Sequence, residues 1–315
     1  MAPAADTSRR HAHAGDRAYA VVVTLLGGSV LFVVGLIVMV CTRLSWPAFA
    51  KLGFFRFLAG SDWNPVEDSF GALPFIYGTL VTSAIAIVLA IPVAIGLALF
   101  LTEMSPDRVR RIVSFFVEIL AAIPSVVFGL WGLLVLVPVL RDTIEPALSR
   151  WLGWVPMFSG PPLGIGFLPA GIVLSIMILP TIASVTIEVL RTMPAALREG
   201  ALALGATRWE AIRAVVLPYA SRGILGAIIL GLARALGETM AVTMLIGNQP
   251  EIHFSLFAAG YSLPAVIANE FAEASGAIHT GALAGLALVL FGVTLMLSAG
   301  ARLLVRLSAR RLVTA

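Results

Sequence analysis

Six apolar stretches, each long enough to cross a lipid bilayer as a helix, recur along this sequence. They cover about residues 18–42, 73–101, 112–140, 166–190, 224–247 and 281–305. A transmembrane helix needs about 20 predominantly apolar residues. Only 12% of the residues are charged, against about 25% in a soluble domain. We therefore predict an all-α polytopic membrane protein with six transmembrane helices.

Arginines concentrate in alternate segments between these stretches. One set of segments carries fifteen of them: Arg9, Arg10, Arg17, Arg108, Arg110, Arg111, Arg191, Arg198, Arg208, Arg213, Arg222, Arg302, Arg306, Arg310 and Arg311. The other set carries Lys51, Arg56, Arg141 and Arg150, and its third loop, 248–280, has no lysine or arginine. Because cytoplasmic loops are enriched in Lys and Arg, we expect both termini, the 102–111 loop and the 191–222 loop to be cytoplasmic.

The expected spans divide the chain into four parts. These are a cytoplasmic tail, 1–17, which we expect to be disordered; a first transmembrane helix with its extracytoplasmic loop, 18–72; a larger transmembrane domain, 73–307, with the cytoplasmic loop 191–222; and a tail, 308–315. The first span is too long for a signal-peptide core and contains no small-residue cleavage site, so we predict an uncleaved anchor. Pro92, Pro124 and Pro180 are expected to kink their helices.

The cytoplasmic segment 193–223 is too polar to span a membrane and is patterned like two short helices. Apolar residues recur on one helix face from Leu197, and Gly205 is expected to end this first helix. Thr207 and Glu210 have the spacing of a capping box, which predicts a second helix start. The Leu-Pro pair at 217–218 is expected to end the second helix. A plain interfacial connector is the alternative interpretation.

The stretch EGALALGATRWEAIRAVVLP, residues 199–218, resembles the EAA loop of ABC importer permeases. The family pattern is E-A-A-x3-G-x9-I-x-L-P, in which the short helix docks in a groove of the ATPase subunit. Gly200 replaces the usual Ala, which loosens a helix by roughly 1 kcal/mol, and Val215 replaces the usual Ile. The resemblance implies an ATPase-docking site formed by Glu199, Gly200, Ala201, Gly205, Leu217 and Pro218.

Three further blocks are similar to the permease subunits of phosphate-specific ABC importers, of the PstC type. They are EILAAIPSVVFGLWGL (118–133), MILPTIASVTIEVLRTMPAALREGALALGATRWEAI (177–212) and LGLARALGETMAVTMLIGN (230–248). The resemblance implies an ABC importer type I permease fold in the bacterial inner membrane. It also implies four partners besides membrane lipid, namely a PstA-type second permease, two ATPase subunits and an extracytoplasmic phosphate-binding protein. We expect no nucleic-acid partner, because in a membrane protein the location of the basic residues matters more than their sum.

The chain lacks the lysine through which a P-loop binds ATP. That motif requires Gly-Lys-Ser/Thr, but Lys51 is the only lysine and a leucine follows it. We therefore expect no catalytic residue and no cofactor in this chain, with ATP and Mg²⁺ bound by the partner ATPase. His253 and His279 stand alone in an outer loop, so we expect no metal site.

Two opposite charges, Arg234 and Glu238, interrupt the fifth apolar stretch. Arg234 lies twelve residues beyond Arg222, about 18 Å along a helix and near the middle of a hydrocarbon core about 30 Å thick. Residues four apart share a helix face, and Thr239 and Thr243 extend it. Because a guanidinium matches a phosphate oxyanion, we predict that Arg234, Glu238, Thr239 and Thr243 line the substrate pathway. A purely structural Arg234–Glu238 ion pair is the alternative.

Other functions stay open at this point. The chain could belong to an importer of another oxyanion, molybdate or sulfate, or to a proton-coupled secondary transporter in which Arg234 and Glu238 act as a pair. A membrane scaffold without transport is the third alternative. Two smaller predictions concern packing: Glu188 forms an interfacial ion pair with Arg191, and the GxxxG of Gly281 and Gly285 marks close helix contact.

Overall fold

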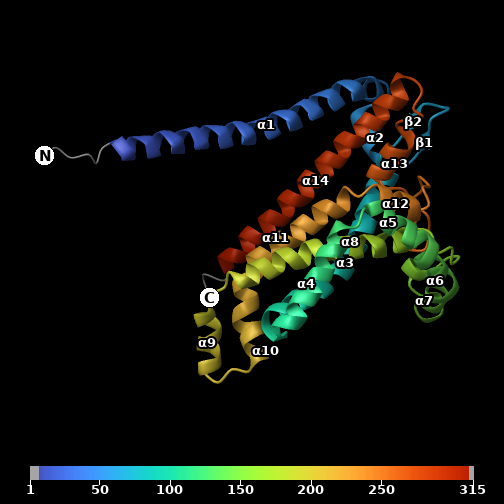
Figure 1. Cartoon of the computed structure of the whole chain (residues 1–315). Coiled ribbons are helices and arrows are strands. Elements are labelled where there is room, and N and C mark those ends of the chain that lie inside the picture. The colour runs from blue at the N-terminus through green and yellow to red at the C-terminus, as the bar shows by residue number, and fades with distance from the viewer. Residues whose placement is uncertain (1–6, 312–315) are drawn as a thin grey trace.

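A computed structural model describes the backbone of residues 7–311 and the side chains of Asp16 and of residues 19–303. Within these residues, six helical stretches are long and apolar enough to cross a membrane: 19–52, 73–104, 125–152, 167–191, 208–236 and 277–303. They form a helical bundle from which two short helices project at one end (Figure 1). The predicted polytopic helical fold is confirmed.

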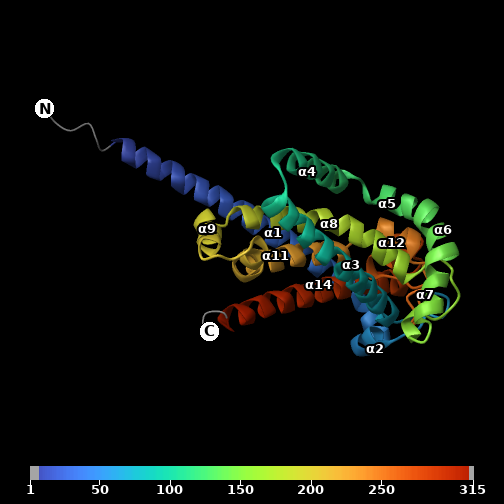
Figure 2. The same ribbon diagram turned by 90° about the horizontal axis from the view of Figure 1, so that it is seen from below.

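The first and last long helices pack together only at one end. Helix α1 (Thr7–Leu52) begins inside the tail that we expected to be disordered, and α14 covers Ala277–Arg311. The two helices lie together near the C-terminal end of α1 and diverge toward the chain termini in both views (Figures 1 and 2). A Cβ atom on Gly281 would lie 2.9 Å from the Leu44 carbonyl oxygen, and one on Gly285 would lie 3.0 Å from the Phe49 ring. The GxxxG prediction of close helix packing is therefore confirmed.

Replacing Gly281 with leucine is expected to separate the end of α1 from α14. The added side chain meets backbone, which cannot move aside easily, and overpacking of this kind costs about 1–3 kcal/mol. We expect a lower thermal unfolding midpoint in detergent. Gly292→Leu on the same helix is the matched control, because a Cβ at Gly292 meets nothing within 4 Å. Equal midpoints for the two variants would contradict the close contact.

A small outer layer closes this end of the bundle. It contains α2 (Phe54–Ala59), the strands β1 (Trp63–Asn64) and β2 (Ser69–Phe70), and α13 (Leu263–Glu270). The antiparallel pair of two-residue strands was not expected from the all-α prediction. The Trp63 Nε1–H donates to Glu270 Oε2 at 2.9 Å, and the His279 ring stacks on Phe70 with centroids 5.3 Å apart. Loop 53–72 is thereby fixed against α13 and α14.

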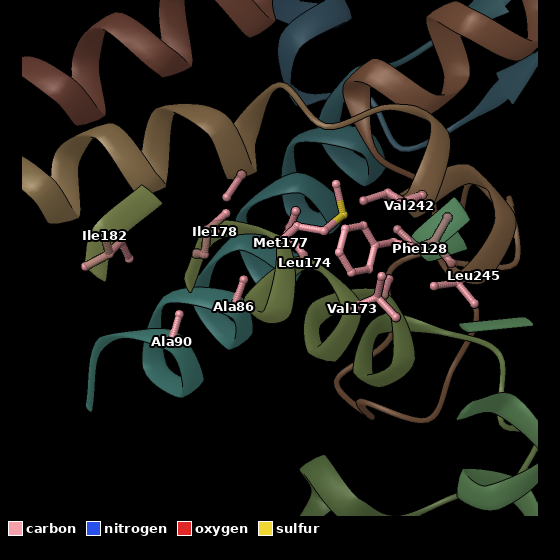
Figure 3. Packing of buried hydrophobic residues seen from close by; sticks show 14 of the residues in the cluster. Ala86, Ala90, Phe128, Val173, Leu174, Met177, Ile178, Ile182, Val242 and Leu245 are labelled. Atoms are coloured by element: carbon pink, nitrogen blue, oxygen red, sulfur yellow. The ribbon is translucent and has the colours of Figure 1, made fainter. Parts of the chain in front are cut away.

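The centre of the bundle is the pair α3 (Leu73–Leu99) and α8 (Phe167–Arg191), which pack along most of their length. Small residues of α3, such as Ala86 and Ala90, lie in one buried cluster with Ile178 and Ile182 of α8 (Figure 3). Small side chains let helix backbones approach closely, which is how membrane helices gain packing energy without a hydrophobic driving force from lipid. Helix α3 continues as a π-helical turn, η1 (Phe100–Met104).

The third expected span, 112–140, is wrong as a single helix. Helix α4 (Asp107–Ala122) is followed by two extended residues, Ile123 and Pro124, with ψ of 129° and 141°. A residue before proline is disfavoured in the α region, so the expected kink at Pro124 is a complete break. The membrane-crossing stretch then begins with α5 (Ser125–Trp131). It continues through η2 (Gly132–Leu136), α6 (Val137–Val139) and η3 (Leu140–Ile144) to α7 (Glu145–Leu152), and η4 (Pro156–Phe158) follows.

Candidate transport pathway and coupling loop

The fifth expected span is broken between its two charges. Helix α11 (Leu217–Leu236) ends at Leu236, Gly237 to Thr239 are not helical, and α12 covers Met240–Leu245. Gly237 is the C-cap of α11, at φ −97° and ψ 0°, and glycine is about 1 kcal/mol less favourable than alanine inside a helix. The prediction of one helix over 224–247, with both charges on one face, is therefore wrong. Gly237 followed by two polar residues was the sequence signal for the break.

Arg234 faces α8 instead of Glu238. It is exposed on the last turns of α11, and its Nη1–H donates to Thr181 Oγ1 of α8 at 3.2 Å. Gly231 permits this approach, since a Cβ there would lie 2.6 Å from Ile182. Among the ion pairs of the described side chains, none joins Arg234 to Glu238. The ion-pair alternative is therefore wrong for this chain, and most of the five guanidinium donors are left for another acceptor.

The other three predicted pathway residues lie in or just beyond the break. Glu238 Oε1 accepts a hydrogen bond from the Ala241 backbone at 3.4 Å and so caps the first turn of α12. The Thr239 hydroxyl donates to the Gly237 carbonyl at 3.4 Å. The Thr243 hydroxyl is buried and has no hydrogen-bond partner among the described residues. The structure thus places these residues along one broken helix without joining them to Arg234 by hydrogen bonds.

Helix α12 is held firmly on its buried side. Val242 and Leu245 lie in the cluster that contains Phe128 of α5 and Val173 of α8 (Figure 3). Helix α5 packs closely against α12: a Cβ on Gly129 of α5 would lie only 2.7 Å from the Met244 sulfur of α12. The unwound residues at 237–239 therefore join a rigid short helix to the long α11.

A groove of about 540 Å³ runs along α8 and α11, on the side of Arg234 that faces Arg222. Its lining residues are Val185, Val189, Arg222, Gly223, Gly226, Ile229, Leu230 and Arg302. Val185 and Leu230 lie one helical turn from Thr181 and Arg234 respectively, so the groove leads away from that contact. Its other end carries Arg222 and the exposed Arg302 of α14. Sequence reasoning used these two arginines only for orientation and missed Thr181 altogether, because their convergence depends on packing between helices.

The 191–222 loop contains the predicted pair of short helices. Helix α9 (Ala195–Ala203) is followed by Gly205 at φ 89° and by α10 (Arg208–Ala211). The capping box is confirmed, since the Thr207 side chain accepts from the Glu210 N–H while the Glu210 carboxylate accepts from the Thr207 N–H. In Figure 1, α9 and α10 project from one end of the bundle.

The second short helix does not end at Leu217-Pro218, as we had expected. It continues through a π-helical turn, η5 (Ile212–Val216), directly into α11. In this turn the Leu217 N–H donates to the Ile212 carbonyl, five residues back. Pro218 is the second residue after this π-helical turn, and the helix continues past a proline that would otherwise kink or break it. The loop is consequently continuous with the helix that carries Arg234.

Most of the predicted ATPase-docking residues are accessible. Glu199, Gly200, Gly205 and Pro218 are exposed, and Ala201 and Leu217 are half-buried. Two large apolar side chains beside them are also exposed, Leu204 at 91% and Trp209 at 64%. Exposed apolar side chains of this size beside the predicted docking residues are compatible with a protein-docking surface.

Two smaller observations concern Glu188 and metal binding. The Arg191 guanidinium donates to Glu188 at 3.0 Å, as expected from their spacing. In the described part of the chain, no group of three or more His, Cys, Asp or Glu side chains could hold a metal ion.

Comparison with known proteins identifies relatives over most of the chain. Residues 90–313 match the family described as "Binding-protein-dependent transport system inner membrane component". The phosphate transport system permease protein PstC of Mesorhizobium japonicum is 47% identical over 303 residues, which cover 95% of this chain and 90% of that protein. The PstC protein of Pasteurella multocida is 48% identical over 282 residues, 87% of this chain and 88% of that protein.

Solved structures share the fold at low sequence identity. A chain of a bacterial ABC transporter involved in import of the acidic polysaccharide alginate superposes with a TM-score of 0.60 at 21% identity, covering 94% of this chain and 98% of that chain. A chain of the inward-facing MetNI methionine ABC transporter gives 0.53 at 19% identity, covering 74% and 95%. This chain therefore belongs to the family of binding-protein-dependent transport system inner membrane components, and within it to the PstC-type permeases.

Proposed function

We propose that this chain is the permease subunit of an ATP-driven ABC importer that carries inorganic phosphate across the cytoplasmic membrane. The observation that carries the proposal is Arg234, an exposed guanidinium beside a helix break with one hydrogen bond to its own chain. An arginine in a membrane helix is costly and usually marks a pathway. The PstC relatives, named as phosphate transport permeases, supply the substrate.

Phosphate would bind Arg234 through charge-assisted hydrogen bonds from the planar guanidinium. Thr181 holds the guanidinium toward α8, and Thr239 supplies a hydroxyl in the break between α11 and α12. The groove along α8 and α11 then offers an exit toward Arg222 and Arg302, whose positive charge attracts the anion to the cytoplasmic end. Movement of α11 against α8 would open and close this route.

A second permease subunit, which we propose to be of the PstA type, would complete the pathway. Arg234 is exposed among the described residues, and the second subunit would supply the wall that faces it. Helix α1 also diverges from the bundle (Figure 2) and exposes large apolar side chains, among them Leu31 at 75% and Phe32 at 73%. A partner helix or lipid would cover this apolar surface.

The two ends of the bundle suit different soluble partners. We place two ATPase subunits at the cytoplasmic loop and its counterpart in the second permease, and ATP and Mg²⁺ would bind there rather than in this chain. An extracytoplasmic phosphate-binding protein would dock on the outer layer. That layer has a hollow of about 660 Å³ between the strand pair and loop 250–253, with Asp62, Glu67 and Glu251 in its lining. Both termini are cytoplasmic in this arrangement, as the arginine distribution indicates.

Uptake by the complete transporter in proteoliposomes tests the proposal. We expect uptake of labelled phosphate that requires the ATPase subunits, the binding protein and ATP, and that excess sulfate or molybdate does not inhibit. Inhibition by either anion would assign the importer to that oxyanion instead. Uptake that is driven by a proton gradient without ATPase subunits would identify a secondary transporter.

A further inference from the structure

An ion pair between a buried carboxylate and a partly exposed arginine joins the docking helix to the membrane helices. The Arg198 Nη2–H of α9 donates to Glu103 Oε1 in η1 at 2.5 Å, across 95 positions of sequence. The Glu103 side chain is only 5% exposed, whereas Arg198 is 35% exposed. Among the ion pairs of the described side chains, this one alone connects α9 to the bundle. Arg198 directly precedes Glu199 of the docking site.

The η1 turn is fixed to the rest of the bundle. The Arg110 Nε–H of α4 donates to the Leu101 carbonyl at 2.7 Å. Leu101 itself is fully buried, in a cluster with Ile187 and Leu190 of α8 and with Ile212 and Val216 of η5. Any displacement of η1 is therefore passed to α3, of which it is the continuation, and to α8, which packs along α3.

The surroundings of the pair leave room for α9 to move. A cavity of about 210 Å³ lies beside it, lined by both members of the pair, by Leu202 of α9 and by residues of α10 and η5. The Arg198 Nε–H is buried and has no hydrogen-bond partner among the described residues. A carboxylate buried as deeply as that of Glu103 is strongly destabilising once its partner leaves. When α9 moves, displacing Glu103 together with Arg198 therefore costs less free energy than separating the two side chains.

We propose that the Glu103–Arg198 ion pair transmits movement of α9 to α3 and α8, and so couples ATP hydrolysis to phosphate movement. This role rests on the proposed function. The route is one of direct contacts: α9 to η1 through the ion pair, η1 to α3 through the chain, α3 to α8 through packing, and α8 to Arg234 through Thr181. Glu103 acts as a positioning residue, because its proposed role runs through Arg198 of α9.

The test measures phosphate imported per ATP hydrolysed by the complete reconstituted transporter. Glu103→Gln keeps the size of the side chain but removes its charge, and we expect a loss of coupling of about tenfold, within the range of interaction energies between contacting residues. Arg198→Lys keeps the positive charge but replaces the planar guanidinium with a compact ammonium group. We therefore expect this variant to retain at least about half of the coupling. Glu103→Arg and Arg198→Glu should each lower the coupling when introduced alone. The double variant that carries both substitutions should recover much of the lost coupling, because it restores the ion pair with the charges exchanged.

Asp142→Asn in η3 is the control, because it removes a carboxylate that is 61% exposed and that pairs with its neighbour Arg141, outside the contacts that join α9 to Arg234. We expect it to couple normally. Normal coupling in Glu103→Gln, or a double reversal no better than the single ones, would overturn the role. Equal loss in Arg198→Lys and Arg198→Gln would also overturn it. The unsubstituted transporter tests the proposed function separately, since its failure to import phosphate contradicts that function whatever the variants do.

Discussion

Replacing Arg234 with glutamine is expected to lower phosphate uptake by the complete transporter about a hundredfold or more while the complex still assembles. The variant loses charge-assisted hydrogen bonds worth about 1.5–3 kcal/mol each, and every 1.4 kcal/mol is about tenfold. Assembly should survive because Arg234 is exposed in the chain and makes one hydrogen bond, to Thr181. Its removal therefore leaves no buried charge unpaired. Uptake in proteoliposomes and co-purification of the subunits are the two measurements.

Two further variants separate a pathway role from a general effect of losing an arginine. Arg150→Gln removes an exposed arginine of α7 and should transport normally. Arg234→Lys keeps the charge but loses the planar fork, so its uptake should lie between those of the native chain and Arg234→Gln. Normal uptake in Arg234→Gln would exclude this arginine from the pathway, and loss of assembly would show that its role is structural.

Replacing Gly205 with aspartate is expected to uncouple the ATPase subunits, with uptake falling more than about tenfold. Gly205 has φ 89°, and a Cβ there meets nothing within 4 Å. The cost is therefore backbone strain rather than a clash, of the order of 1–3 kcal/mol, and the turn between α9 and α10 changes shape. Glu199→Lys should act similarly by reversing the charge of an exposed docking residue. Uptake and ATPase co-purification measure both.

Gly200→Ala is the control for the coupling loop. It introduces the residue usual in the family's motif at an exposed position where a Cβ meets nothing within 4 Å. Alanine favours a helix over glycine by about 1 kcal/mol, so α9 should become firmer and coupling should be kept. Undiminished co-purification and uptake in Gly205→Asp and Glu199→Lys would show that the ATPase subunits dock elsewhere.

The sequence by itself determined the features that depend on neighbouring residues and on the bilayer. Runs of about 20 apolar residues have few ways to satisfy their backbone except as membrane helices, so the helical fold was predictable. The capping box of Thr207 and Glu210 and the turn at Gly205 were predicted correctly, because both depend on residues within one turn. The close contact at Gly281 and Gly285 was predicted as well, although its partner helix was not.

The tertiary structure alone decided which side chains meet. A spacing of four placed Arg234 beside Glu238, but the helix ends between them and Arg234 turns to Thr181, 53 positions away. The pair of Glu103 and Arg198 spans 95 positions and had no signal in the sequence pattern. Spacing within one helix predicts neighbours only while that helix continues. Contacts between helices depend on which faces pack together, and in this chain those contacts form both the candidate pathway and the link to the docking helix.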